Sequence, residues 1–364
     1  LIEPRRAPLA MLGLGGSVAT PADGITAEVV VVGDERQLDA LGDAVRDKIV
    51  LFNNPMPPYD TIRGSSYGET VRFRHGGARL AADKGAVACL IRSVTARSLR
   101  SAHTGAMSYG NGNRRIPAAA LSIEDAEMIA RLAARGKRVV VNLRMEARDE
   151  GMVSSANVVA ELRGREKPDE IVVIGGHLDS WDVGHGAHDD GAGCVMSMEA
   201  VNILRKLRLI PRRTIRVVLF TNEENGLNGA KQYVEDHAHE MGRHVAAIEA
   251  DSGGFRPTGF SFECEDRTKA AAGERQLRAI AQLMSELGPM RIRSGGSGAD
   301  VGRMRSKGVF LMGLEVDGST YFDYHHSHGD TLDKVDPREL TDATAAMAVM
   351  AYVIADMPER LGER

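Results

Sequence analysis

Acidic and histidine residues that follow short apolar runs are the residues of this chain whose types and spacing could do chemistry. His177 and Asp179 stand two positions apart after such a run, and Asp189 and Asp190 come next, just before a Gly-Ala-Gly turn at 191–193. A histidine with a carboxylate two residues on suits a metal ligand and the acceptor that orients its ring. Taken alone, each group also has an ordinary explanation as a capped strand end or a helix cap. His185 and His188 are rival ligands, but we expect them to be solvated because their loop is rich in glycine.

Two further groups of the same kind follow later apolar runs. Glu223 and Glu224 are adjacent, and Asp251 comes after the next run. Neighbouring residues at the end of a strand point in different directions, so one glutamate can bind a metal while the other moves a proton. A charged surface turn is the alternative for that pair. Three of the 11 histidines fall within four residues, at His325, His326 and His328.

These groups become informative when they are taken together. Six carboxylates at one sheet edge would be costly to place together without cations: Asp179, Asp189, Asp190, Glu223, Glu224 and Asp251. Two Zn²⁺ ions would offset the charge of three carboxylate ligands and of Glu223. The ligand set that we expect is His177, Asp189, Glu224, Asp251 and His326. Imidazole and carboxylate ligands without thiolate fit zinc, with cobalt or manganese as alternatives, in an open catalytic site.

Strands that alternate with helices must position these residues. Strands are expected at 158–162, 170–174, 214–220, 246–249 and 309–314, and helices at 193–207, 270–287 and 338–357. This alternation predicts an α/β sandwich with a mostly parallel central sheet flanked by helices. Ligands of such sheets gather outside the carboxyl ends of the strands, which is where the acidic residues fall.

The first part of the chain has a different pattern and is predicted to form a β-rich domain of its own. Strands are expected at 27–32, 48–52, 86–92, 116–121 and 138–143, and helices at 69–83 and 123–135. The sequence turns polar over 147–155. We therefore place two domains, at 1–151 and 152–364, which agrees with about 150 residues per domain.

Composition and charge exclude several classes of function. The 364 residues carry a net charge of -4, which offers no basic surface for nucleic acid. The apolar runs are far shorter than the roughly 20 residues of a membrane span. The segment Gly-Gly-Ser-Gly-Ala at 295–299 fails the nucleophile-elbow spacing of serine hydrolases, and Gly-Leu-Gly-Gly-Ser-Val at 13–18 fails the dinucleotide fingerprint.

Beyond these groups, the chain resembles the co-catalytic dizinc aminopeptidase and carboxypeptidase family, and within it the plasma glutamate carboxypeptidase branch. The resemblance extends over nearly the whole chain. Its segments are Gly-Gly-His-Leu-Asp-Ser-Trp-Asp-Val-Gly at 175–184, Asp-Asp-Gly at 189–191, Glu-Glu at 223–224, His-His-Ser-His-Gly-Asp-Thr at 325–331, Gly-Ile-Thr-Ala-Glu-Val at 24–29 and His-Thr-Gly at 103–105.

The resemblance implies a role for each site residue. His177 and Asp251 would hold one zinc, Glu224 and His326 the other, and Asp189 and a water or hydroxide would bridge the two ions. Glu223 would be the general base, and Asp179 would fix the ring of His177. His325 lies where related enzymes place a group that stabilises the oxyanion. The first domain resembles the inserted protease-associated module of the family, for which Ile-Pro-Ala-Ala at 116–119 is typical.

The same resemblance implies an exopeptidase that acts on small peptides, most of all unblocked dipeptides. An aminopeptidase for longer peptides, an amidohydrolase and a catalytically silent binding relative are the alternatives. Relatives are secreted or periplasmic and often homodimeric, and we expect the same here. Relatives also carry a further amino-terminal segment that completes the catalytic domain, which we expect the native protein to have.

Overall fold

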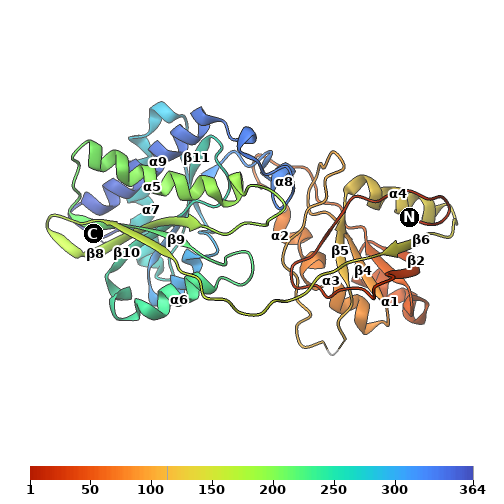
Figure 1. Ribbon diagram of the computed structural model, residues 1–364. Helices are drawn as coiled ribbons and strands as arrows, with labels where there is room; N and C mark the ends of the chain where they lie inside the picture. The colour runs from red at the N-terminus through yellow and green to blue at the C-terminus, as the bar shows by residue number, and fades with distance from the viewer. Residues whose placement is uncertain (113, 364) are drawn as a thin grey trace. The chain divides into compact units, whose positions relative to one another are not determined.

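The computed structural model describes residues 1–112 and 114–363 and divides into two units (Figure 1). The first unit comprises Leu1–Val153 and the short segment Phe322–Gly329. The second comprises Ser154–Tyr321 and the chain from Asp330 onward. We expected the segment Phe322–Gly329 in the second domain, and the structure groups it with the first.

The first unit is built on a six-stranded sheet in the order β1-β5-β4-β3-β2-β6. The four middle strands run parallel, and the edge strands β1 and β6 pair antiparallel. The strands are β1 (Met11–Gly13), β2 (Ile25–Val32), β3 (Ile49–Phe52), β4 (Ala88–Arg92), β5 (Ala118–Leu121) and β6 (Val140–Leu143). The α-helices are α1 (Glu35–Leu41), α2 (Tyr67–Thr70), α3 (Arg72–Asp83) and α4 (Ile123–Ala134).

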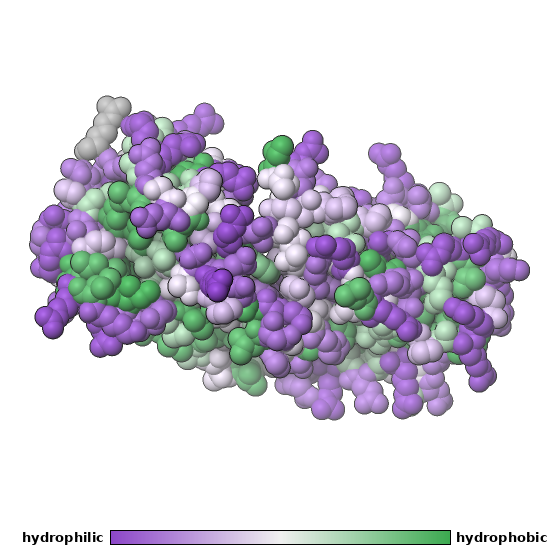
Figure 2. Space-filling view, turned by 90° about the horizontal axis from the view of Figure 1, so that it is seen from above, coloured by the Kyte–Doolittle hydropathy of each residue, from purple (hydrophilic) through white to green (hydrophobic). Residues whose placement is uncertain are grey.

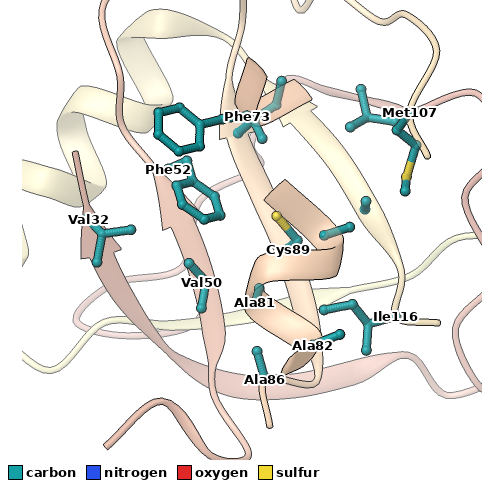
Figure 3. Close-up of a cluster of buried hydrophobic side chains, with 14 of the residues drawn as sticks. Val32, Val50, Phe52, Phe73, Ala81, Ala82, Ala86, Cys89, Met107 and Ile116 are labelled. Atoms are coloured by element: carbon teal, nitrogen blue, oxygen red, sulfur yellow. The ribbon is translucent and has the colours of Figure 1, made fainter. Parts of the chain in front are cut away.

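Alternating apolar residues give this sheet two buried faces. Val50 and Phe52 of β3 belong to one core with Phe73 of α3, where the two phenyl rings stack 4.6 Å apart (Figure 3). Ile49 and Leu51 of the same strand belong to a second core with α4. Because successive side chains of a strand point to opposite faces, four apolar residues in a row place this strand between two helical layers.

The second unit has a seven-stranded mixed sheet in the order β12-β11-β13-β10-β8-β9-β7. Its central strands β13, β10, β8 and β9 are parallel, whereas β7 and β11 pair antiparallel with β9 and β13. The strands are β7 (Val158–Leu162), β8 (Lys167–His177), β9 (Arg213–Phe220), β10 (His244–Glu249), β11 (Pro257–Glu263), β12 (Arg291–Ser294) and β13 (Phe310–Val316). The expected α/β class is confirmed.

Helices cover both faces of this second sheet. The helices are α5 (Ala192–Lys206), α6 (Asn228–Asp236), α7 (Arg267–Gln282) and α9 (Pro337–Asp356), and the one-turn helix α8 (Tyr321–Tyr324) follows β13. The helices α5 and α9 pack together on one face, and α6 lies on the other (Figure 1). Among the described residues, the helices are too short or too polar to cross a membrane. Figure 2 shows polar side chains spread between small apolar patches on the face it presents.

Several elements differ from the sequence-based expectations. The helix expected over 69–83 is broken at Val71 into α2 and α3. The strands β11 and β12 and the helices α1 and α6 were not predicted. Their sequences explain this, since β11 begins Pro-Thr-Gly and β12 has one apolar residue in four. Residues of these types do not predict a strand by themselves, and pairing with the neighbouring strand stabilises the extended conformation.

Candidate metal centre

The first predicted ligand, His177, is the last residue of β8 and is buried. Two glycines precede it because the strand passes close to other backbone and side-chain atoms. A Cβ at Gly175 would lie 2.1 Å from the carbonyl oxygen of Val218, and one at Gly176 would lie 2.0 Å from Oδ2 of Asp190. The Gly-Gly-His sequence therefore lets the strand carry the imidazole into a crowded, acidic edge of the sheet.

Two carboxylates face the imidazole of His177. Nε2 lies 3.3 Å from Oδ1 of Asp189 and 3.5 Å from Oδ1 of Asp251. Nδ1 lies 2.8 Å from the main-chain oxygen of Asp179. Because that oxygen can only accept, Nδ1 carries a proton, and Nε2 points toward the two carboxylates. Burial lowers the pKa of His177, but the carboxylates of Asp189 and Asp251 outweigh it, and the net pKa lies well above the ordinary value.

This arrangement fits a cation. Nε2 of His177 and Oδ1 of Asp251 are buried and have no hydrogen-bond partner among the described residues. Buried polar atoms without a hydrogen-bond partner are costly, and a metal ion in place of the Nε2 proton would accept lone pairs from both atoms. One imidazole with carboxylates and no thiolate is a donor set that zinc accepts.

Asp190, which the sequence offered as a helix cap, ties the end of β8 to the start of α5. Its Oδ2 accepts from the backbone N–H of His177 at 3.0 Å, and its Oδ1 accepts from the backbone N–H of Gly193 at 3.0 Å. Burial raises the pKa of Asp190 well above its usual range. Its ligand atom also lies within 4.8 Å of those of His177 and Asp251. The expected capping role is confirmed by the bond to Gly193.

Asp179 holds the loop after β9 beside the end of β8. Its carboxylate accepts from the backbone N–H groups of Glu223 at 2.9 Å and of Glu224 at 3.2 Å. Its main-chain oxygen, as noted, faces the His177 ring, while its carboxylate Oδ1 lies 3.9 Å from Nδ1. One residue therefore sets the position of both the imidazole and the two glutamates.

The two glutamates have different surroundings. Glu224 is buried, and its Oε2 accepts a 2.6 Å hydrogen bond from the indole N–H of Trp181. Burial and the nearby Asp251 carboxylate raise the pKa of Glu223 to about 8. Trp181 was missed at the sequence level as a site residue, although it is the only tryptophan of the chain and stands four residues after His177.

Asp330 is a second residue whose role the sequence did not reveal. Its carboxylate accepts from the backbone N–H of His188 at 2.7 Å and from that of Asp189 at 3.2 Å. Its main-chain oxygen accepts from the backbone N–H of His185 at 2.7 Å. Asp330 is the first residue of the second stretch of the second unit, and it is hydrogen-bonded to the loop that carries Asp189.

The expectation for the two histidines of this loop is correct for one and wrong for the other. We expected His185 and His188, which were rival ligands, to be solvated because the loop is rich in glycine, and His185 is indeed exposed. His188 is instead fully buried, with its ring stacked on Phe255 at 4.2 Å and its Nδ1 accepting from the backbone N–H of Gly254 at 3.1 Å. Burial lowers the pKa of His188, so the ring is neutral.

Two buried acids behind the site were also missed. Glu249, the last residue of β10, accepts from the backbone N–H groups of Ala299 at 2.9 Å and Val301 at 2.7 Å. Asp300 is fully buried, and burial with the neighbouring Glu249 charge raises its pKa to about 9. Their positions depend on a loop some fifty residues away in sequence, which no local pattern links to β10.

The second unit therefore contains six of the eight predicted site residues, at the carboxyl ends of β8, β9 and β10 and in the loop that leads to α5. They are His177, Asp179, Asp189, Glu223, Glu224 and Asp251. The other two, His325 and His326, lie in the segment Phe322–Gly329 of the first unit.

Comparisons with known proteins identify the family of the chain. The profile of Peptidase family M28 matches residues 157–351. Carboxypeptidase Q from Mus musculus is 43% identical over 361 residues, which is 99% of this chain and 74% of the mouse protein. A Peptidase M28 precursor from Shewanella amazonensis has a crystal structure that superposes with a TM-score of 0.91 at 38% identity, covering 99% of this chain and 80% of that one.

A more distant structure shares the fold alone. The zinc aminopeptidase from Bacillus subtilis superposes with a TM-score of 0.63 at 19% identity, covering 96% of this chain and 79% of that chain.

Proposed function

The chain belongs to peptidase family M28 and is therefore a metallopeptidase, a hydrolase, and we propose that it is a two-zinc exopeptidase that hydrolyses unblocked dipeptides and other small peptides. The substrate class is supported by the similarity to carboxypeptidase Q over 99% of the chain. An aminopeptidase for longer peptides remains the second candidate, because the fold is shared with a zinc aminopeptidase.

One observation carries the metal-dependent part of this proposal. The Nε2 atom of His177 has carboxylate oxygens of Asp189 and Asp251 at 3.3 and 3.5 Å and no hydrogen-bond partner among the described residues. We assign His177 and Asp251 to one zinc ion and Asp189 to the position between two ions. Asp251 and Asp189 would supply the negative charge that offsets the charge of the first ion.

Glu224 and His326 are proposed as the ligands of the second ion. Glu224 is supported by its buried position next to Asp179 and Trp181. For His326 the chain path is the support. Asp330 is hydrogen-bonded to the backbone of Asp189, and His326 precedes it by four residues, which span at most about 14 Å when extended.

The chemistry then divides among this chain's own residues. When bound, the two zinc ions supply Lewis acidity and a water of lowered pKa. Glu223 takes a proton from the attacking water as the water oxygen bonds to the scissile carbonyl carbon. When the C–N bond breaks, Glu223 passes that proton to the leaving amine. Without metal, the pKa of Glu223 is raised to about 8. A raised pKa supports this role, because a carboxylate with a higher pKa holds the transferred proton better.

His325 is proposed to stabilise the oxyanion that forms at the carbonyl oxygen. A donor aimed at developing charge contributes a factor of about 10² to 10³ to turnover. His325→Ala should therefore lower kcat by about 10²-fold with little effect on zinc content. An unchanged kcat would contradict this role.

A panel of three substrate types tests the substrate class. Unblocked dipeptides, dipeptides with a blocked amino group, and aminoacyl-nitroanilides are offered to the purified protein at equal concentration. We expect cleavage of the unblocked dipeptides to dominate. Preference for the aminoacyl-nitroanilides and for longer peptides would favour the aminopeptidase instead.

Three further features are part of the proposal and rest on the resemblance to the family. The first unit is proposed to be a protease-associated module that was inserted into the catalytic domain. The protein is proposed to be exported, as a secreted or periplasmic enzyme, and to form a homodimer. Cell fractionation tests the location, and light scattering of the eluting protein tests the dimer.

A further inference from the structure

The His-Thr-Gly segment at 103–105 has no place in the function described so far, yet within the first unit it contacts the segment that carries His325 and His326. Nδ1 of His103 lies 2.6 Å from the main-chain oxygen of His325. The backbone N–H of Thr104 donates to the main-chain oxygen of His326 at 2.9 Å. Both peptide oxygens of the two histidines are thus fixed by neighbouring residues of one loop.

The side chain of His103 makes a single hydrogen bond with the described part of the chain in this arrangement. Its side chain is 1% exposed, and burial lowers its pKa to about 4, so the ring is neutral at pH 7. A main-chain oxygen can only accept, so Nδ1 of His103 carries the proton that it donates to His325. Its other nitrogen, Nε2, is buried and has no partner among the described residues. His103 therefore contributes a single hydrogen bond, which its Nδ1–H donates to the main-chain oxygen of His325.

The imidazole of His326 has its own acceptor in the same loop. Its Nδ1 lies 3.2 Å from the main-chain oxygen of Thr104 and 3.3 Å from Nη1 of Arg74. A guanidinium has donors only and the Thr104 oxygen can only accept, so Nδ1 can pair with one of them at a time. When Nε2 binds a metal ion, Nδ1 carries the proton and its partner is the Thr104 oxygen. With the proton on Nδ1, the lone pair of Nε2 is available to a metal ion, as in most metal-binding histidines.

Two backbone conformations are consistent with a loop that holds His326 in place. His326 has φ of 58°, a left-handed conformation that residues other than glycine adopt only where their surroundings hold them. Gly105 has φ of +140°, and a Cβ there would lie 2.5 Å from the guanidinium of Arg74. Arg74 is buried, donates to the hydroxyl of Tyr67 at 2.7 Å and has no ion pair with any described residue. Glycine at 105 leaves the space that this arginine occupies.

We propose that the loop His103–Gly105 is the outer support of the metal ligand His326, with His103 as a positioning residue. The inference rests on the proposed function, in which His326 binds the second zinc ion. The oxygen of Thr104 accepts the Nδ1 proton of the tautomer that presents Nε2 to the metal, and His103 holds the peptide bond between the two histidines.

Three substitutions of His103 separate this role from a general packing role. Asn places its amide nitrogen close to the position of Nδ1 and can keep the bond to His325, whereas Gln places it near the position of Nε2 and cannot. Leu fills the space without any donor. Ile129→Val is the matched control, because Ile129 is fully buried in the same unit on α4 and belongs to a different core.

The readouts are the zinc affinity of each site in chelator competition and the absorption spectrum of the cobalt-substituted protein. His103→Leu and His103→Gln should weaken one of the two sites by about 10- to 100-fold, which is typical when an outer support of a ligand is lost. Their cobalt spectra should change, and kcat should fall more than KM rises. His103→Asn should stay close to the wild type in all three measurements, and Ile129→Val should lower only the unfolding temperature.

Wild-type zinc affinity and an unchanged cobalt spectrum in His103→Gln would overturn the inference. So would equal losses in His103→Asn and His103→Gln, because the hydrogen bond would then not be what matters. If His103→Leu fails to fold, the comparison of His103→Asn with His103→Gln still tests the inference. If the wild type itself binds no second metal ion, the proposed function fails, and that result is visible before any variant is made.

Discussion

The indole N–H of Trp181 donates a 2.6 Å hydrogen bond to Oε2 of Glu224, a proposed ligand of the second zinc ion. Trp181 is the only tryptophan in the chain. The only tryptophan fluorophore of the protein is therefore hydrogen-bonded to a residue of the candidate metal centre. The same bond holds the carboxylate of Glu224 in place, so Trp181 has a structural part in the site as well.

Metal binding should consequently be visible in tryptophan fluorescence. Adding zinc to chelator-treated protein should change the emission intensity, because the charge on Glu224 is then shared with a cation. The change should follow the same zinc concentration as the return of activity. Glu224→Gln should remove most of the response. Full recovery of activity with unchanged emission would contradict Glu224 as a ligand.

Glu223→Gln should remove turnover while leaving the metal in place. Gln has nearly the same shape as Glu but cannot accept a proton, so kcat should fall by about 10²- to 10⁴-fold. Zinc content and KM should stay near the wild-type values. Asp189→Ala is the comparison, because it should lose metal as well as activity. If Glu223→Gln keeps its activity, the general base is another residue.

Asp179→Asn should disturb the site through two loops at once. The Asp179 carboxylate accepts from the backbone N–H groups of both Glu223 and Glu224, and Asn has only one side-chain oxygen to offer. We expect zinc affinity or kcat to fall by about 10-fold or more. Asp182→Asn is a matched control, since Asp182 is exposed in the same loop. Equal behaviour of the two variants would show that the paired hydrogen bonds do not matter.

Acid should destabilise the second unit through a buried histidine that lies away from the metal ligands. His244, the first residue of β10, is buried, its Nδ1 lies 3.1 Å from the main-chain oxygen of Glu240, and its Nε2 lies 2.9 Å from the hydroxyl of Tyr233. The main-chain oxygen accepts from Nδ1, so Nε2 accepts from the hydroxyl. Burial lowers the pKa of His244 from 6.5 to about 4, so the folded ring is neutral.

The sign of this effect follows from proton binding. As the pH falls below about 6.5, the unfolded chain takes up a proton that the folded protein refuses until about pH 4. The stability is thus complete above pH 6.5 and falls toward pH 4, by about 3 kcal/mol for a shift of this size. Urea unfolding of metal-free wild type and His244→Asn across this range measures it. The variant should depend less on pH, and equal slopes would contradict the assignment.

The sequence was sufficient to locate the site because its signals are local. The apolar runs of β8, β9 and β10 are each followed by acidic residues, and parallel strands bring their carboxyl ends to one edge. That rule needs no knowledge of distant contacts. It therefore placed His177, Glu223 and Asp251 at the same edge of one sheet.

The residues that were missed depend on contacts between distant parts of the chain. Asp330 reaches Asp189 across 141 positions, and Glu249 accepts from the backbone N–H of Ala299 across 50 positions. We expected His188 to be solvated because its loop is rich in glycine, yet Phe255 stacks on its ring. The segment Phe322–Gly329 groups with the first unit although its sequence continues that of the second. No local pattern carries such information.

The central claim is that hydrolysis depends on metal held by His177, Asp189 and their neighbours. The most direct measurement removes metal with a chelator, adds zinc back in steps, and follows both bound zinc and the hydrolysis of an unblocked dipeptide. We predict that activity is lost on chelation and returns as up to two zinc ions bind per chain. Hydrolysis at the wild-type rate in the chelated protein would contradict the account.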